Sequence, residues 1–291
     1  MKNYTLWTAL VTPLNGKGAV HFGDLEKIAR RQEAAGNGIL ILGSTGEGLA
    51  LSDAEKREVV DFVAGLGLKV PVMTGVGGFN LQAQREWITY CNDKTDAFLL
   101  VVPLYSKPGL IGQTEWFRQL LDDAHKPCMI YNIPSRTGVK LFPQVMASLK
   151  SHPNIWAMKE ASGSLHDFQV FRETVPDIPL FSGDDALLPF FSAVGCKGLV
   201  SVCSNVWPDE VSLYTEKCLK GDTATLFPLW HTAVKTMFSA SNPIPVKRLL
   251  KEKGWISLAA LRPPLTEEEL SSADALLAID AQIKNWYQKN R

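Results

Sequence analysis

The stretch GILILGSTGEG, residues 38–48, holds the pattern that decides the fold: an apolar run that ends in a polar, glycine-rich turn. The next stretch, SDAEKREVVDFVAGL (52–66), has helical spacing, and Ser52 and Glu55 have the spacing of a capping box. An apolar run without polar alternation is typical of a strand covered on both faces. Residues 38–66 therefore predict a strand, a loop and a helix.

Strand-like runs of this kind recur along the chain. They occupy residues 6–11, 38–43, 70–76, 96–103, 127–133, 154–160, 178–183 and 198–203, and helical patterns such as 23–35, 52–66, 112–124 and 142–150 lie between them. Eight strands that alternate with helices predict an α/β fold, a closed (β/α)8 TIM barrel of parallel strands. The alternative is an open doubly wound sheet, which usually has fewer strands.

The chain after about Trp207 has no further strand-like run. Helical patterns cover 208–220, 223–239, 243–253 and 266–288, and PPLTEEEL (263–270) has the Pro and Thr of a helix start. We therefore expect residues 1–206 to form the catalytic barrel and residues 207–291 to form a C-terminal helical region packed on it.

Composition limits the classes of partner. The 291 residues carry 30 Lys and Arg against 30 Asp and Glu, whereas binding to nucleic acid or to an anionic membrane normally leaves a basic excess. Five Cys without a C-x-x-C pair, and His residues without H-x-x-x-H spacing, argue against disulfides and metal sites. With no signal peptide and no apolar run of about 18 residues, we expect a cytoplasmic protein that acts on small molecules.

In a TIM barrel the chemistry lies at the C-terminal ends of the strands, and Lys159 is the lysine that ends an apolar run there. Burial in this place would lower its pKa from about 10.4 towards about 7–8. The neutral amine could then attack a carbonyl carbon and form a Schiff base. The other possibility is that Lys159 simply pairs with Glu160 or another carboxylate.

Polar residues follow the neighbouring strand, which ends in YNIPSRTG (131–138). Tyr131 could shuttle protons for Schiff-base chemistry, or it could be a core tyrosine whose hydroxyl bonds to the backbone. Arg136 offers a planar fork for a substrate carboxylate, or it is a surface charge.

Three further loops carry weaker signals. GSTGEG (43–48) brings backbone N–H groups and two hydroxyls together, which suits a small carboxylate, and we expect Glu47 to brace this loop. GVGGFN (75–80) lacks the last glycine of a dinucleotide fingerprint, so NAD is not expected. We expect Asp184 and Asp185 to stabilise a loop turn and to hold no metal.

Five motifs, in this order along the chain, resemble the dihydrodipicolinate synthase (4-hydroxy-tetrahydrodipicolinate synthase) family of the N-acetylneuraminate lyase superfamily of Schiff-base aldolases. They are GSTGEG (43–48), Pro103-Leu104-Tyr105, YNIPSRTG (131–138), Lys159-Glu160 and FSGDD (181–185). The resemblance runs from about Thr8 to Asn205, and the helical tail is also as in the family.

The resemblance implies a cofactor-free lyase in lysine and diaminopimelate biosynthesis. Pyruvate would form an imine with Lys159, lose a methyl proton, and attack the aldehyde of L-aspartate 4-semialdehyde. By motif match, Tyr131 is the proton donor and acceptor, and Ser44 and Tyr105 complete a hydroxyl relay. The implied substrate-binding residues are Thr45 and the backbone at Val200 for the pyruvate carboxylate, Gly183 as part of the pocket wall, and Arg136 for the carboxylate of the aldehyde.

The resemblance also implies a homotetramer, a dimer of dimers, in which Tyr105 reaches the neighbouring subunit's site. Ser44 departs from most synthases, which carry Thr there, whereas sialate lyases usually have Ser. Arg136 argues the other way, because sialate lyases generally lack it. Another pyruvate-dependent aldolase, such as an N-acetylneuraminate or 2-keto-3-deoxy sugar-acid lyase, stays open as an alternative. A non-catalytic keto-acid binder is disfavoured by the intact Lys159, Tyr131, Ser44 and Tyr105.

A second departure concerns feedback. In lysine-inhibited members, an interface site uses His, Glu and Tyr at positions that match Asp53, Lys56, Gln84 and Leu104, with Asn80 retained. The positive charge of Lys56 should repel a cationic amino acid, and the carboxylate that would attract it is missing. We therefore expect weak or absent inhibition by lysine.

Overall fold

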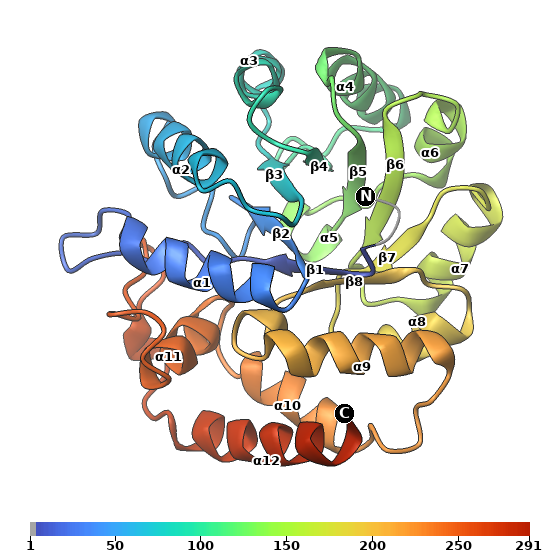
Figure 1. The fold of residues 1–291 in the computed structure, drawn as a ribbon. Coiled ribbons are helices and arrows are strands. Elements are labelled where there is room, and N and C mark those ends of the chain that lie inside the picture. Colours follow the sequence, from blue (N-terminus) through green and yellow to red (C-terminus); the bar gives the residue numbers. More distant parts are fainter. Residues whose placement is uncertain (1–3) are drawn as a thin grey trace.

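Eight parallel strands close into a barrel in the order of the sequence, as the computed structural model of residues 4–291 shows (Figure 1). Hydrogen bonds between β1 and β8 complete the closure. The strands are β1 (Leu6–Ala9), β2 (Gly38–Ile41), β3 (Val72–Val76), β4 (Ala97–Val101), β5 (Cys128–Asn132), β6 (Ile155–Glu160), β7 (Leu180–Ser182) and β8 (Gly198–Ser201). Each strand lies within its predicted run, so the TIM barrel is confirmed and the open sheet is wrong.

Helices surround the barrel and follow its strands (Figure 1). They are α1 (Phe22–Ala34), α2 (Asp53–Gly65), α3 (Leu81–Cys91), α4 (Leu110–Asp123), α5 (Pro134–Thr137), α6 (Pro143–Leu149), α7 (Leu165–Thr174), α8 (Leu188–Ala193) and, after β8, α9 (Pro208–Lys220). The predicted capping box opens α2, because the Ser52 side chain accepts from Glu55 N and the Glu55 side chain accepts from Ser52 N. The helix start was therefore readable from residues 52–55.

The tail is helical, as expected, but two helix starts were predicted wrongly. Besides α9, which matches the predicted 208–220, it contains α10 (Leu229–Met237), α11 (Ile244–Glu252) and α12 (Asp274–Asn290), and α12 packs against α9, α10 and α11. The helix predicted from residue 266 begins only at Asp274, because Thr266 caps a 3-10 turn and Leu270 then becomes extended (φ −121°, ψ 96°). The helix predicted from residue 223 begins at Leu229, after Pro228, which has no N–H to donate to a preceding turn.

Two clusters of buried side chains stabilise this arrangement. One fills the inside of the barrel and includes Trp7, Leu40, Met129, Tyr131 and Ala157. The larger cluster lies between the barrel and the helices and continues under the tail. Within residues 4–291, no helix has both the length and the apolar character needed to cross a bilayer.

Candidate active site

Lys159 points into the barrel at the C-terminal end of β6. Side chains two residues apart on a strand face the same side, and Ala157 belongs to the cluster inside the barrel. Lys159 is 5% exposed, so its amine is removed from bulk water. The strand thus carries the amine to the end of the barrel at which substrates bind.

The surroundings of Lys159 favour its neutral form. Burial lowers its pKa to about 7, while the Asp185 carboxylate acts to raise this pKa and the Arg136 guanidinium acts to lower it further. Glu160 does not neutralise the amine, because its carboxylate accepts from Asn132 Nδ2 (2.8 Å) and from Ser162 N (2.6 Å) instead. The alternative of a Lys159–Glu160 pair is therefore wrong, and near pH 7 a large share of the amine is free to react.

Tyr131 is the neighbour of Lys159 in the sheet. The two residues are register partners on β5 and β6, and Lys159 Nζ lies 4.3 Å from the centroid of the Tyr131 ring. Burial raises the pKa of Tyr131 above its usual range, so the phenol keeps its proton at neutral pH. The structure therefore places a neutral phenol beside an amine that is about half neutral near pH 7.

Gly183 leaves the space that the Lys159 side chain occupies. A Cβ at this position would lie 2.7 Å from Lys159 Cε and 2.6 Å from Ala161 Cβ, which is closer than real Cβ atoms come. The glycine that follows β7 therefore forms part of the wall around the lysine.

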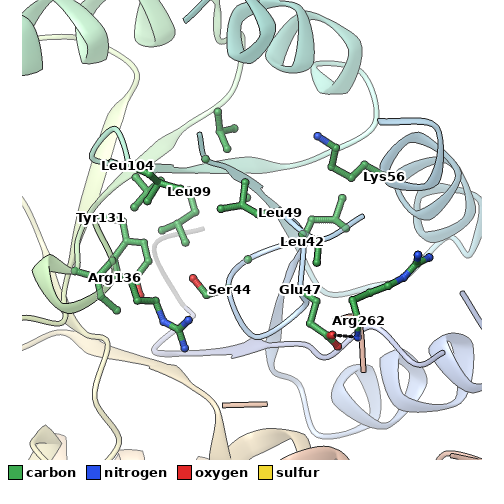
Figure 2. A pocket seen from close by; sticks show the side chains of 18 of the residues that line it. Leu42, Ser44, Glu47, Leu49, Lys56, Leu99, Leu104, Tyr131, Arg136 and Arg262 are labelled. Carbon is green, nitrogen blue, oxygen red and sulfur yellow. Dashed lines mark hydrogen bonds between the residues drawn. The ribbon is translucent and has the colours of Figure 1, made fainter. Parts of the chain in front are cut away.

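A cavity of about 300 Å³ is lined by Ser44, Tyr131 and Arg136 (Figure 2). Val200 lies within β8 beside Trp7 of β1, with its side chain inside the barrel. Lys159 and Gly183 are not part of the cavity wall, but Lys159 is the register partner of Tyr131, which is. The predicted site residues at the ends of β2, β5, β6, β7 and β8 thus lie at the same end of the barrel. Ser44, Tyr131 and Arg136 line the cavity, whereas Lys159, Gly183 and Val200 do not.

Tyr105 does not join the other site residues within one chain. It is 85% exposed, its ring lies 6.2 Å from that of Phe79, and its backbone has a φ of +62°. A non-glycine residue in this region of φ is uncommon and often marks a functional position.

The turn at 43–48 needs its glycines for close backbone approach. A Cβ at Gly48 would lie 2.2 Å from Leu42 O, and one at Gly46 would lie 2.9 Å from Leu10 O. Glu47 braces the turn, as predicted: its carboxylate accepts from the buried Lys247 Nζ and from Arg262 N (2.8 Å). The tail therefore holds this loop in position.

Asp184 and Asp185 organise loops, as expected. Asp184 Oδ1 accepts from Ala186 N (2.9 Å), and the Asp185 carboxylate accepts from Ser201 Oγ and from Val202 N (3.0 Å). Burial raises the pKa of Asp185 to about 6. Among residues 4–291, no group of His, Cys, Asp and Glu side chains could hold a metal ion.

No sequence pattern predicted the contribution of the tail to the site. Asn242 and Arg262 line the cavity together with Pro264 and Leu265, and Asn242 Nδ2 donates to Thr45 Oγ1 at 2.9 Å. These residues follow or precede helical patterns, and no motif marks them as site residues. Only the folded chain places them beside the strand ends.

Three of the positions matched to a lysine site line the same cavity. They are Lys56, Gln84 and Leu104 (Figure 2 labels the first and last). Lys56 Nζ lies 2.5 Å from Asp53 Oδ1, so its charge is paired with an exposed carboxylate. Asn80 instead caps α3, accepting from Ala83 N at 3.1 Å.

Comparisons with known proteins agree on one family. The profile of the Dihydrodipicolinate synthetase family matches residues 2–283. A 4-hydroxy-tetrahydrodipicolinate synthase from Francisella philomiragia is 48% identical over 98% of this chain and 97% of its own length. The dihydrodipicolinate synthase of Cyanidioschyzon merolae, solved with lysine bound, superposes with a TM-score of 0.87 at 32% identity, covering 96% of this chain and 98% of the other. The chloride-inhibited enzyme of Acinetobacter baumannii, solved with pyruvate, has a TM-score of 0.87 at 28% identity, covering 97% and 98%.

Proposed function

Because this chain belongs to the dihydrodipicolinate synthetase family, we propose that Lys159 carries its reaction as a Schiff base with pyruvate. The chain is an aldolase-type lyase with the 4-hydroxy-tetrahydrodipicolinate synthase activity of its curated relatives. One observation supports the role of Lys159 most strongly: its buried amine lies 4.3 Å from the ring centroid of a protonated tyrosine at the mouth of the barrel. The imine formed with Lys159 takes up the electrons when the methyl proton leaves, so the proposed reaction uses no cofactor.

The proposed reaction proceeds through covalent steps on this amine. The neutral Lys159 Nζ attacks the keto carbon of pyruvate, and the carbinolamine loses water to give an imine. Loss of a methyl proton gives an enamine, whose carbon attacks the aldehyde of L-aspartate 4-semialdehyde. Tyr131 would take up the methyl proton and give a proton to the aldehyde oxygen, because its phenol lies beside Lys159 Nζ, to which the reacting substrate is bonded. Attack by the substrate's amino group on the imine carbon then closes the ring and releases Lys159.

The loop at 43–48 and the end of β8 would hold the keto acid. Ser44 lines the cavity and would join Tyr131 in a hydroxyl relay. Thr45 and the backbone at Val200 would bind the pyruvate carboxylate, and Gly183 leaves room for the reacting lysine. These assignments follow from the motif match and from the neighbourhood of Lys159.

Arg136 supports the synthase reaction over a sugar-acid lyase reaction. Its guanidinium lines the cavity and lies near enough to affect the pKa of Lys159. A planar, permanently charged guanidinium would bind the carboxylate of the short aldehyde substrate with two parallel hydrogen bonds. Ser44 keeps the hydroxyl that the relay needs, so it does not favour the alternative.

We also propose that the enzyme works as a homotetramer built from tight dimers. Leu49, Phe79, Tyr105 and Ile111 are large apolar or aromatic side chains that stay exposed in the single chain. Tyr105 is therefore placed to contact a second copy, whose relay it would complete. The five cysteines are buried free thiols, which supports a reducing compartment such as the cytoplasm.

The positive charge at Lys56 supports the proposal that lysine inhibits this enzyme weakly or not at all. Lys56 lines the cavity region that also contains Gln84 and Leu104, where a carboxylate and a phenol would be needed to hold a cation.

Assays of two reactions test the proposed function. The purified enzyme should condense pyruvate with L-aspartate 4-semialdehyde in a coupled assay, and it should cleave N-acetylneuraminate or 2-keto-3-deoxy sugar acids far more slowly. An Arg136→Met variant should lose the condensation through a higher KM for the aldehyde. Faster cleavage of a sugar acid than condensation would contradict the assignment.

A further inference from the structure

Asn242 links the C-terminal tail directly to the substrate loop. It lies between α10 and α11, some two hundred residues after the loop at 43–48. Its Nδ2 donates to Thr45 Oγ1 at 2.9 Å, and Thr45 itself is 4% exposed. Asn242 also lines the cavity that contains Ser44, Tyr131 and Arg136. A residue of the tail thus touches a hydroxyl of the proposed keto-acid site.

The direction of this hydrogen bond determines what the Thr45 hydroxyl can do. A hydroxyl has one proton to donate and two lone pairs to accept with, whereas an amide NH₂ group only donates. Thr45 Oγ1 therefore uses a lone pair for Asn242, and its proton must go to another acceptor. A carboxylate oxygen only accepts, so it is the partner that this arrangement suits.

The other half of the Asn242 amide is unpaired. Among the residues that the structure describes, Asn242 Oδ1 is buried and has no hydrogen-bond partner. A buried carbonyl oxygen without a donor lowers the stability of the folded protein. An apolar side chain at this position would avoid this cost but could not donate to Thr45 Oγ1, so the contact with Thr45 is what the amide supplies.

We infer that Asn242 is a positioning residue for the keto acid: it holds Thr45 Oγ1 so that the Thr45 hydroxyl donates its proton to the substrate carboxylate. The inference rests on the proposed function, because it requires a keto-acid carboxylate at Thr45. Asn242 acts through Thr45 and touches no reacting atom. It makes the tail a determinant of pyruvate binding as well as a brace of the barrel.

The sharpest test is Asn242→Asp, which keeps the shape of the side chain and replaces the donor by an acceptor. The Thr45 proton then turns towards the new carboxylate and is lost to the substrate. The KM for pyruvate should rise about tenfold or more, while kcat at saturating pyruvate changes much less. Asn242→Ala should raise the KM by a smaller factor, because the freed hydroxyl can still rotate towards the substrate.

A double-mutant cycle separates positioning from simple charge repulsion. Because Asn242 acts through Thr45, Asn242→Asp should change the KM for pyruvate much less on a Thr45→Val background than on the wild type. Repulsion by the new carboxylate would act equally on both backgrounds. An equal effect on both would overturn the inference, as would an unchanged KM in Asn242→Asp.

Asn154→Ala is the matched control. Asn154 Nδ2 donates to Leu121 O and Ala124 O at the opposite end of the barrel, before β6. Its loss should lower Tm and leave the KM for pyruvate unchanged. If Asn242→Asp does not fold, Asn242→Ala enters the same cycle. Failure of wild-type enzyme to trap pyruvate on Lys159 would instead overturn the proposed function.

Discussion

At the scale of single residues, the site depends on the protonation of one amine. The pKa of Lys159 is lowered to about 7, chiefly by burial, while the neighbouring charges of Asp185 and Arg136 act in opposite directions. The amine therefore needs no general base to become a nucleophile near neutral pH. The neutral phenol of Tyr131 supplies the proton donor beside it.

The pH dependence of imine formation follows from this pKa. Below about pH 7 the Lys159 amine is protonated, so the rate of pyruvate trapping by borohydride should fall about tenfold for each further pH unit. Above that pH the rate should level off. A trapping rate that keeps rising up to about pH 10, as expected for an exposed lysine, would show that the amine is not desolvated.

Gly183→Ala tests whether the wall around Lys159 needs its glycine. The added Cβ would lie 2.7 Å from Lys159 Cε, so the lysine must shift, and a misplacement of about 1 Å can cost about a hundredfold in rate. Condensation activity should fall by that order while the circular dichroism spectrum stays unchanged. Gly65→Ala in α2, where a Cβ meets nothing within 4 Å, is the control and should keep full activity.

At the scale of elements, the tail and the loop at 43–48 form one unit. The buried Lys247 of α11 donates to the Glu47 carboxylate and to Ala260 O, and Arg262 N donates to Glu47 as well. Burial lowers the pKa of Lys247, and the charge of Glu47 opposes this. The ion pair therefore holds the turn against the tail, from which Asn242 reaches Thr45.

Removing one partner of this pair should be costly. Lys247→Met leaves a buried carboxylate without its cation and should lower the free energy of unfolding by about 3–5 kcal/mol. Urea unfolding measures this change, and adding Glu47→Gln should recover part of it. Lys220→Met, which breaks the exposed pair with Glu216, should cost at most about 1 kcal/mol. Equal effects of the two lysine variants would contradict the role of the brace.

The sequence predicted the elements that carry the chemistry better than those that support it. The eight strands and the α2 capping box were readable because apolar runs and the Ser52–Glu55 spacing are local signals. The position of Lys159 beside Tyr131 followed from placing both at strand ends. Asn242 could not be predicted, because its contact with Thr45 exists only once the tail has folded over the barrel.

At the scale of the whole molecule, Tyr105 is the residue that a single chain leaves without a role. It is 85% exposed and is held in an unusual backbone conformation (φ +62°). If it completes the site of a second copy, two inactive variants should complement each other. Co-expressed Lys159→Ala and Tyr105→Phe chains should regain about a quarter of wild-type activity, since half of the dimers are mixed and each has one intact site.

Each variant expressed alone is the control for this experiment. Activity of the mixture no higher than the mean of the two separate preparations would show that Tyr105 acts within its own chain.

Regulation is a property of the assembled molecule, and the charge of Lys56 gives a prediction for it. Condensation rates measured over a rising lysine series should stay nearly constant into the millimolar range, because Lys56 repels a cationic ligand from this part of the cavity. A Lys56→Glu variant reverses the charge and should bind lysine better than the wild type. Strong inhibition of the wild type by millimolar lysine would contradict the prediction.

In the proposed reaction the amine of Lys159 bonds covalently to a keto acid. Pyruvate and borohydride, followed by peptide mass spectrometry, test it most directly. We predict one reduced adduct per chain, on the peptide that contains Lys159, and none in Lys159→Ala. No adduct, or an adduct that persists in Lys159→Ala, would show that Lys159 does not form the Schiff base.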